Sequence, residues 1–487
     1  MRIASRLVLA AALAAVLLDA CTTSPKAPAA TALATPTVRP HDKRHFTVDE
    51  AALPFEALEA PAVTTDRWWG VEDGAGFRLE VPANWNGRLV MYAHGYRGPD
   101  EVLTPSLPHF RRALVAAGYA WGASTYSAND YDVRAGIEDT NALALAFTRI
   151  ARDHGRVLAN PTRTYIIGHS MGGHIAAAAV EAETLKRAHH KVSYSGAMPM
   201  CGVLGDLELF DYFAAYSLAA QQLSGVGPVG FPAVDWNARA PAVVAHFFSS
   251  FPSPAAPTTP IRLRDTADAR ELKAIVMNLT GGARPIFEEG FVRPSNASAW
   301  STFGIGADAG GILLHRPQST AGTRYRFETA TKPTAAEAAF NRDIPRASPE
   351  VDADPLQPDG LRFVPLLPGE IGVPVLTLHN LGDVFVPFSM EQIYHRRVEA
   401  HGHAGLLVQR AIRSPLHCDF TEAEEAAGFR ALVDWVEHGR KPGGDEVMRP
   451  AKLAARDYGC RFTDNTVALD ERDEGALRAT MPACHAP

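Results

Sequence analysis

Residues 164–174 read T-Y-I-I-G-H-S-M-G-G-H. A short apolar run leads into Gly168-His169-Ser170-Met171-Gly172, and an alanine-rich helical stretch follows. A serine hydroxyl is a poor nucleophile at neutral pH, so it must stand on a sharp turn where a base can reach it. Glycine at positions 168 and 172 lets neighbouring backbone approach without a Cβ clash. The stretch therefore predicts a nucleophile elbow with Ser170 as the nucleophile; the alternative is a glycine-rich strand-to-helix turn with an incidental serine.

Strands and helices alternate on both sides of this elbow. Two or three short strands are expected from residue 67 onward, and a final helix is expected from Thr421, where Thr421 and Glu424 fit a capping box and Gly439 ends the helical pattern. The other expected strands are 89–93, 119–124, 165–167, 192–200, 373–379 and 406–412, and the other expected helices are 110–117, 137–152, 171–187 and 389–400. This βα repeat predicts an α/β fold with a mostly parallel central sheet flanked by helices.

The alternation stops between residues 202 and 368. A structureless loop of this length is rare inside a compact domain, so the segment is expected to be an inserted cap, entered through a helix at residues 207–223. Four polar residues at this entry either face the substrate or serve as helix-start acids and packing residues. They are Asp206, Glu208, Asp211 and Tyr212.

A nucleophilic serine needs a histidine base and a carboxylate that orients the base, and in elbow enzymes both follow the serine in the chain. Asp383 lies in L-G-D-V-F-V-P, on the turn after a predicted strand. Its alternative role is a purely local turn hydrogen bond. His417 lies in R-S-P-L-H-C, between the last predicted strand and the last helix, and is the expected base. His169 and His174 flank the elbow and are expected to be packing or positional residues.

Acyl transfer also needs donors for the oxyanion, which backbone N–H groups usually supply. One donor is expected from Met171, directly after the nucleophile. The second is expected from Tyr96 in H-G-Y-R-G, with Gly95 beside it, although this segment can also be a tight turn without a catalytic role. No HExxH pattern and no paired Cys/His spacing occurs, so neither a metal nor a cofactor is expected.

The N-terminus has the features of an export signal. Arg2 and Arg6 precede an apolar run at residues 7–18, which is too short to span a bilayer as a mature helix. The following L-D-A-C resembles a bacterial lipobox, which predicts Cys21 as the lipidated first residue of the mature chain. The alternative is ordinary signal cleavage, with Cys21 left as a spare thiol. We therefore expect a protein that is anchored by lipid to the bacterial envelope, at the outer membrane, or that is secreted.

The remaining four cysteines form an even set, as expected in an oxidising compartment, and allow three pairings. Cys201 follows a predicted strand and Cys418 follows His417, so both are expected at the same end of one sheet. We favour Cys201 with Cys418 and Cys460 with Cys484. In the alternative, Cys201 is a free buried thiol.

Composition limits the choice of partners. The chain has 487 residues, 46% of them hydrophobic, and a formal net charge of -7, with no dense Lys/Arg block. Nothing in this composition indicates nucleic-acid binding.

The motifs GHSMGG, HGYRG, GDVFVP and PLHC resemble the elbow, oxyanion loop, acid turn and histidine loop of α/β-hydrolase-fold serine hydrolases. The resemblance covers residues 67–200 and 370–440. The segment V-P-A-N-W-N-G-R and the cysteine after the histidine are similar to tannases and feruloyl esterases. In that family a cysteine precedes the nucleophile and pairs with the cysteine after the histidine. His169 stands there in this chain, which leaves Cys201 as the substitute partner.

The resemblance implies an enzyme that hydrolyses carboxylic esters, small or polymeric, outside the cytoplasm. An amidase or peptidase with the same three residues is one alternative, and a non-catalytic lipoprotein that binds an envelope ligand is another. The expected organisation is a signal peptide at 1–20, a lipidated cysteine and disordered tether at 21–45, hydrolase core at 46–201, cap at 202–368, hydrolase core again at 369–440, and a C-terminal tail at 441–487 that the second disulfide would close.

Overall fold

The structure is a computed structural model that describes residues 44–253, 255–294, 316–327, 332–357 and 360–468, together with residues 478, 481, 482 and 484. The chain divides into residues Met1–Pro40 and a compact unit, His41–Pro487, which holds all of the described residues. The predicted signal peptide, Cys21 and most of the predicted tether lie outside the described residues. No helix among the described residues is both long and apolar enough to cross a membrane.

The core is an eight-stranded mixed sheet with the order β12-β11-β8-β7-β4-β6-β3-β2. Strands β2 and β3 pair antiparallel, as do β3 and β6, and all other neighbours are parallel. The strands are β2 (Thr65–Glu72), β3 (Ala75–Pro82), β4 (Arg88–Ala93), β6 (Ala120–Ser124), β7 (Arg163–His169), β8 (Gly196–Met200), β11 (Val375–Asn380) and β12 (Leu407–Ile412). Two short pairs lie outside this sheet, namely β1 (Thr47–Val48) with β5 (Val102–Leu103) and β9 (Phe248–Ser250) with β10 (Arg262–Leu263).

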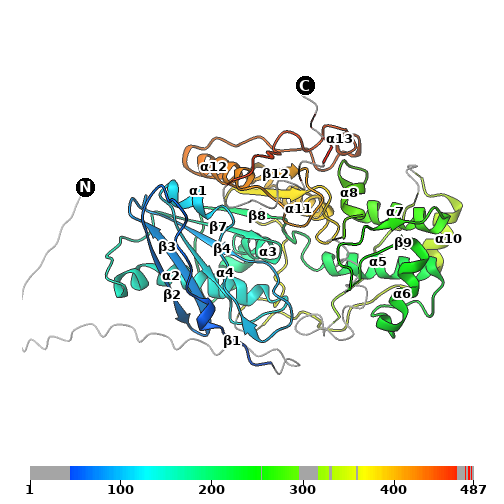
Figure 1. Ribbon diagram of the computed structural model, residues 1–487, viewed down its shortest axis with the longest axis horizontal. Coiled ribbons are helices and arrows are strands. Elements are labelled where there is room, and N and C mark those ends of the chain that lie inside the picture. Colours follow the sequence, from blue (N-terminus) through cyan, green and yellow to red (C-terminus); the bar gives the residue numbers. More distant parts are fainter. Residues whose placement is uncertain are drawn as a thin grey trace, which may run out of the picture. The chain divides into compact units, whose positions relative to one another are not determined.

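Each face of the sheet has its own hydrophobic cluster, because successive strand residues point to opposite faces. In β4, Leu89 and Met91 belong to one cluster, and Val90 and Tyr92 belong to the other. Helices α2 (Val133–Asp153), α3 (Met171–Ala178) and α11 (Ser389–Ala400) contribute to the first cluster. Helices α1 (Arg111–Ala116) and α12 (Glu422–His438) contribute to the second. The core is therefore a sheet between two helical layers (Figure 1).

This strand order, with the strand-turn-helix unit of β7 and α3 at its centre, is that of the α/β-hydrolase fold. The predicted fold class is confirmed. Ser170 lies in the sharp turn between β7 and α3, at the carboxyl end of the parallel strands, which is the end where such sheets carry their sites.

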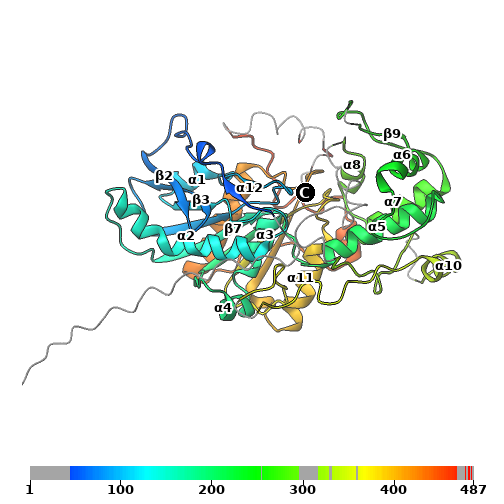
Figure 2. The same cartoon turned by 90° about the horizontal axis from the view of Figure 1, so that it is seen from below.

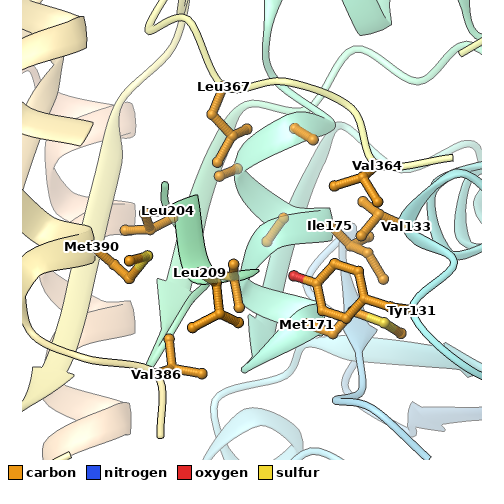
Figure 3. Close-up of a cluster of buried hydrophobic side chains, with 14 of the residues drawn as sticks. Tyr131, Val133, Met171, Ile175, Leu204, Leu209, Val364, Leu367, Val386 and Met390 are labelled. Atoms are coloured by element: carbon orange, nitrogen blue, oxygen red, sulfur yellow. The ribbon is translucent and has the colours of Figure 1, made fainter. Parts of the chain in front are cut away.

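The segment between β8 and β11 supplies the remaining large group of helices. Figures 1 and 2 both show α5, α6, α7 and α10 together, away from β2 and β3. The helices within its described residues are α5 (Glu208–Ser224), α6 (Trp236–Phe247), α7 (Ala267–Leu279), α8 (Phe287–Phe291) and α10 (Ala335–Asp343). Figure 3 shows Met171 and Ile175 of α3 beside Tyr131 and Val133, in the same cluster as Leu209 of α5. The insertion thus shares a hydrophobic core with the sheet.

Among the described residues, the tail after α12 contains the short helix α13 (Pro450–Leu453). Short 3-10 turns lie elsewhere, at Glu50–Ala52 and Ala404–Leu406. The final long helix follows the prediction closely. The Thr421 side chain accepts the N–H of Glu424, the Glu424 side chain accepts the N–H of Thr421, and Gly439 ends the helix with a φ of 70°. Local capping chemistry is thus present at both ends of α12.

Two expected elements differ clearly from the structure, and α2 begins at Val133, four residues before the expected start at 137. The helix expected at 171–187 is two helices, α3 and α4 (Ala182–Arg187). The chain bends between them at Glu181, which forms an isolated bridge with Ile371 and whose buried carboxylate accepts the N–H of Gly369 at 3.0 Å. Tertiary contacts with the chain entering β11 thus override the local helical preference at Glu181. The strand expected at 192–200 begins only at Gly196.

Glu181 gives a prediction about stability and pH. Burial raises the pKa of this carboxyl group from its usual 4.5 to about 7. Between these two pH values the unfolded chain releases a proton that the folded chain keeps, so this group lowers stability as pH rises. Glu181→Gln keeps an acceptor oxygen and cannot ionise. Relative to wild type, its free energy of unfolding is expected to rise by roughly 3 kcal/mol between about pH 4 and about pH 8.

Urea unfolding at several pH values measures this difference. Glu183→Gln, on the partly exposed side of α4, is the matched control and is expected to show no such rise. A Glu181→Gln variant whose stability tracks that of wild type at every pH would contradict the prediction.

Candidate functional site

The nucleophile elbow is built on a strained serine. Ser170 has φ 58° and ψ -121° between the end of β7 and the start of α3. This left-handed region is unfavourable for a residue with a Cβ, and a strained turn of this kind projects the side chain out of the sheet. The backbone N–H of Ser170 donates to the carbonyl of Met200 at 3.0 Å and to Sγ of Cys201 at 3.3 Å. The end of β8 therefore holds the turn in place.

The three motif glycines lie where backbone approaches backbone. A Cβ on Gly168 would lie 2.1 Å from the carbonyl oxygen of Gly172, and a Cβ on Gly172 would lie 2.0 Å from that of Ala93. A Cβ on Gly95 would lie 3.2 Å from Cβ and 3.7 Å from Oγ of Ser170. Positions 168 and 172 have no room for any side chain, and Gly95 brings the loop after β4 against Ser170.

Gly172→Ala is expected to destabilise the fold severely. The clash is with a main-chain oxygen of the central strand, so no rotamer change relieves it, and the cost should be roughly 3 kcal/mol or more. Gly372→Ala is the matched control, because a Cβ at that position meets nothing within 4 Å. Thermal unfolding of both variants checks this prediction. Equal melting temperatures would contradict it, because they would show that the elbow backbone can move to accommodate a Cβ.

The structure brings Ser170, His417 and Asp383 into one hydrogen-bonded chain. The Ser170 hydroxyl lies 2.8 Å from Nε2 of His417, and Nδ1 of His417 lies 2.6 Å from Oδ2 of Asp383. A carboxylate only accepts hydrogen bonds, so the imidazole proton sits on Nδ1 and leaves Nε2 free to accept the serine proton. The Asp383 side chain is fully buried and the His417 side chain is 21% exposed. This order of groups suits general-base activation of a hydroxyl.

Asp383 is fixed on both of its oxygens. Its Oδ1 accepts the backbone N–H groups of Phe385 and Val386 at 2.9 and 3.0 Å, while Oδ2 faces His417. The local turn hydrogen bonds and the contact with His417 therefore occur together in one carboxylate. Asp383 follows β11 and His417 follows β12, so neighbouring parallel strands deliver both groups to the same edge.

The loop that carries Tyr96 lies beside Ser170. The Tyr96 hydroxyl donates to Oδ1 of Asp130 at 3.1 Å, and the buried Asp130 carboxylate also pairs with Arg44 at 3.0 Å. The Tyr126 hydroxyl donates to the carbonyl of His94 at 3.0 Å. Met171 is the first residue of α3, where backbone N–H groups have no partner inside the helix. Both predicted donors thus lie on segments that flank Ser170.

Both favoured disulfides are present. Cys201 pairs with Cys418 across 217 residues, and Cys460 pairs with Cys484. The first bond lies directly against the site, because Sγ of Cys418 is 3.3 Å from Nε2 of His417. Within the described ranges, Cys201, Cys418 and His417 make up the group of three possible metal ligands. Both sulfurs are bonded to each other, so neither offers a thiolate to a metal while the disulfide is closed.

A buried acid behind the elbow was not identified from the sequence. Glu425 on α12 lies 2.7 Å from Nε2 of His169 and 3.3 Å from Nδ1 of His109, and Tyr92 lies 3.3 Å from Nδ1 of His169. Burial alone would raise the pKa of Glu425, but the two histidines hold it at about 2. His169 is thus a packed, paired residue, as expected. The available signal was a second glutamate beside the capping-box residue on the buried side of α12.

His174 is also a packing residue. It is fully buried, with its ring nitrogens near the hydroxyl of Tyr131 and the carbonyl of Pro365 at 3.1 and 2.8 Å. Burial lowers its pKa to about 4, so it is neutral at physiological pH. Neither flanking histidine competes with His417 for the serine.

The inserted segment contacts the acid turn directly. The Tyr212 hydroxyl donates to the carbonyl of Val384 at 2.7 Å, and the buried guanidinium of Arg284 donates to the carbonyl of Leu381 at 2.7 Å. Gly290 of α8 packs so closely that a Cβ there would lie 1.9 Å from the carbonyl oxygen of Gly382. Tyr212 is therefore a packing residue, and the insertion helps to shape the turn that carries Asp383.

The other polar residues at the entry to the insertion also have structural partners. Asp206 is buried and pairs with Arg397 at 2.7 Å, and Glu208 pairs with the same arginine at 2.8 Å. Asp211 accepts the N–H of Ser319 at 2.6 Å. These contacts fit the packing alternative.

Comparison with known proteins gives local and distant likenesses. No family model matches the chain. The chain is 32% identical over 74 residues to an o-phthalyl amidase from Xanthobacter agilis, a match that covers 15% of this chain and only 16% of that protein. Among solved structures, a tannin acyl hydrolase from Aspergillus niger has a TM-score of 0.40 at 14% identity, covering 80% of this chain and 86% of the other. A feruloyl esterase B from Aspergillus oryzae has a TM-score of 0.39 at 13% identity, covering 82% and 86%.

Proposed function

We propose that this protein is a serine hydrolase that cleaves carboxylic esters through an acyl-enzyme. The observation that carries the proposal is the hydrogen-bonded chain from Ser170 through His417 to the buried Asp383. In the first step His417 takes the hydroxyl proton as Ser170 attacks the carbonyl carbon, and Asp383 holds the imidazole in the required tautomer. A non-catalytic binding protein has no need of this alignment.

The backbone N–H groups of Met171 and Tyr96 are proposed to stabilise the oxyanion. Support comes from their place on the two segments that flank Ser170, one at the start of α3 and one directly after Gly95. His417 then gives its proton to the leaving alcohol, and water attacks the acyl-enzyme with His417 again as base. Each well-placed donor contributes on the order of 3 kcal/mol to transition-state stabilisation.

The substrate is proposed to be encountered outside the cytoplasm. Two disulfides support an oxidising compartment, where such bonds persist. The predicted signal and the lipidation of Cys21 extend this proposal to an enzyme tethered to the bacterial outer membrane or secreted. The large insertion beside the acid turn favours a bulky or polymeric ester over a small one.

Amide hydrolysis is the second candidate, favoured by the 74-residue match to an o-phthalyl amidase. The same three residues serve both reactions. An alkoxide leaves more easily than an amine anion, so ester cleavage depends less than amide cleavage on protonation of the leaving group by His417.

A panel of matched chromogenic esters and anilides, including a phthalyl pair and acyl chains of increasing length, tests the proposal on the full chain. Turnover of esters above anilides is expected. Faster turnover of the phthalyl anilide than of its ester would favour the amidase, and no turnover of any member would contradict hydrolase function.

A further inference from the structure

The loop that carries His417 is held from outside the sheet by the C-terminal end of the chain. We call residues 413–419 the histidine loop. We call residues 456–464, Arg478, Pro482 and Cys484 the C-terminal brace. The Cys460–Cys484 disulfide joins the two ends of the brace across 24 residues. Such a bond restricts the conformations open to the segment that it closes.

Arg413 ties the start of the histidine loop to the brace. Its guanidinium donates to the carbonyls of Arg456 and Tyr458, each at 3.0 Å, and to that of Pro482 at 3.2 Å. Its backbone N–H donates to Oγ1 of Thr463 at 2.9 Å. Arg413 is 3% exposed, and burial lowers the pKa of its guanidinium. A planar group with five donors suits a ring of carbonyls in a way that an ammonium does not.

Arg478 makes the reciprocal contact from the brace to the loop. Its Nη1 and Nη2 lie 2.7 and 3.0 Å from the two oxygens of Glu424, in a bidentate pair whose side chains are 1% and 0% exposed. Nη2 also donates to the carbonyl of Asp419, and Nε lies 3.4 Å from Oδ2 of the same residue. Asp419 is two residues after His417, and Glu424 caps the helix that follows the loop.

Asp419, which Arg478 contacts, also bonds to the histidine loop and to the strand end before the Asp383 turn. Its carboxylate accepts the hydroxyl of Ser414, at the start of the histidine loop, and that hydroxyl accepts the N–H of Leu416 at 3.3 Å. Its carbonyl accepts the side-chain N–H of Asn380 at 2.9 Å, and Asn380 ends the strand before the Asp383 turn. Arg478 therefore fixes a residue that contacts both loops.

We infer that Arg478 is a positioning residue: through Asp419 it keeps His417 Nε2 within hydrogen-bond distance of Ser170 Oγ, and full activity requires the brace closed by Cys460–Cys484. This inference rests on the proposed function. The Cys201–Cys418 bond anchors the chain just after His417, whereas the brace fixes the loop before it and at Asp419. A displacement of about 1 Å between base and nucleophile costs on the order of 100-fold in rate.

The test compares Arg478→Met and Arg478→Lys with Arg111→Met in the full chain. Arg111 forms a similar buried pair with Glu80 at 2.6 Å, on α1 and β3, so neither partner belongs to the histidine loop or to the C-terminal brace. Melting temperature, kcat and KM are measured for each, together with the low-field proton NMR signal of the hydrogen between His417 and Asp383. That signal reports alignment without turnover.

Arg478→Met is expected to lower kcat on the order of 100-fold with KM nearly unchanged, and to broaden or abolish the low-field signal, well below its melting temperature. Arg478→Lys should recover part of kcat and part of the low-field signal. Arg111→Met should lose stability and keep kcat and the signal. Wild-type kcat and signal in folded Arg478→Met, or an equal loss in Arg111→Met, would overturn the inference.

If Arg478→Met does not fold, the double variant Cys460→Ser/Cys484→Ser takes its place, with the same expected losses and the same overturning outcomes. If wild type hydrolyses no ester or amide, the proposed function fails, while the low-field signal still shows whether the brace aligns His417. The two failures are therefore distinguishable.

Discussion

Ser170→Ala is expected to lower kcat by about 10⁶-fold, to the level left by binding and oxyanion contacts alone. The Ser170 hydroxyl faces Nε2 of His417 at 2.8 Å, and alanine has no atom to attack the substrate carbonyl. The elbow itself should survive, because its backbone bonds to Met200 and Cys201 use the N–H of residue 170. Single-turnover and steady-state assays on the best substrate of the panel measure the loss.

The control experiment for Ser170→Ala measures whether this variant is as stable as wild type. Its melting temperature should match that of wild type, and covalent labelling by an organophosphonate should disappear. Residual turnover within tenfold of wild type would remove Ser170 from the reaction and leave the site to another nucleophile.

Asp383→Asn is expected to lower kcat by about 10⁴-fold with little effect on KM. Two backbone N–H groups point at Oδ1, so an asparagine at this position must keep its oxygen there and turn its NH₂ toward Nδ1 of His417. The ring must then accept at Nδ1 and carry its proton on Nε2. An imidazole in that tautomer cannot take the proton of Ser170.

A control variant separates this effect from the loss of a hydrogen-bonded carboxylate charge. Asp445 accepts the backbone N–H of Ala411 at 2.8 Å, outside the hydrogen-bonded chain. Asp445→Asn should retain kcat within a factor of about two, while Asp383→Asn retains its fold and loses turnover. If the two variants were equally active, the carboxylate would have no part in orienting the base.

Much of the site was predictable because each member carries a local signal. Ser170 stands between an apolar strand and a helix, with glycines where backbone must approach backbone. Asp383 and His417 each follow a predicted strand in the expected chain order. The strand periodicity and the capping box at Thr421 likewise depend on residues close in sequence, and the structure contains both.

The errors and omissions have a common cause. The helix expected at 171–187 breaks because Glu181 bonds to Gly369, a residue 188 positions away. The pair of His169 with Glu425, the contact of Arg284 with Leu381, and the brace residue Arg478 all join segments far apart in the chain. No local pattern encodes which distant partner a buried charge will meet.

The sequence by itself determined the α/β class, the elbow at Ser170 and the identity of its two partner residues, because these follow from periodicity, turn chemistry and chain order over short stretches. It favoured one of three disulfide pairings, the one that the structure contains, and it left the contacts of the C-terminal tail unassigned. The tertiary structure decided those contacts, by burying Arg413 of the histidine loop against Pro482 and Arg478 of the tail against Asp419. Buried charges and sulfurs contact residues that are distant in sequence only after the sheet and its loops have packed together. These contacts are therefore determined by the tertiary structure.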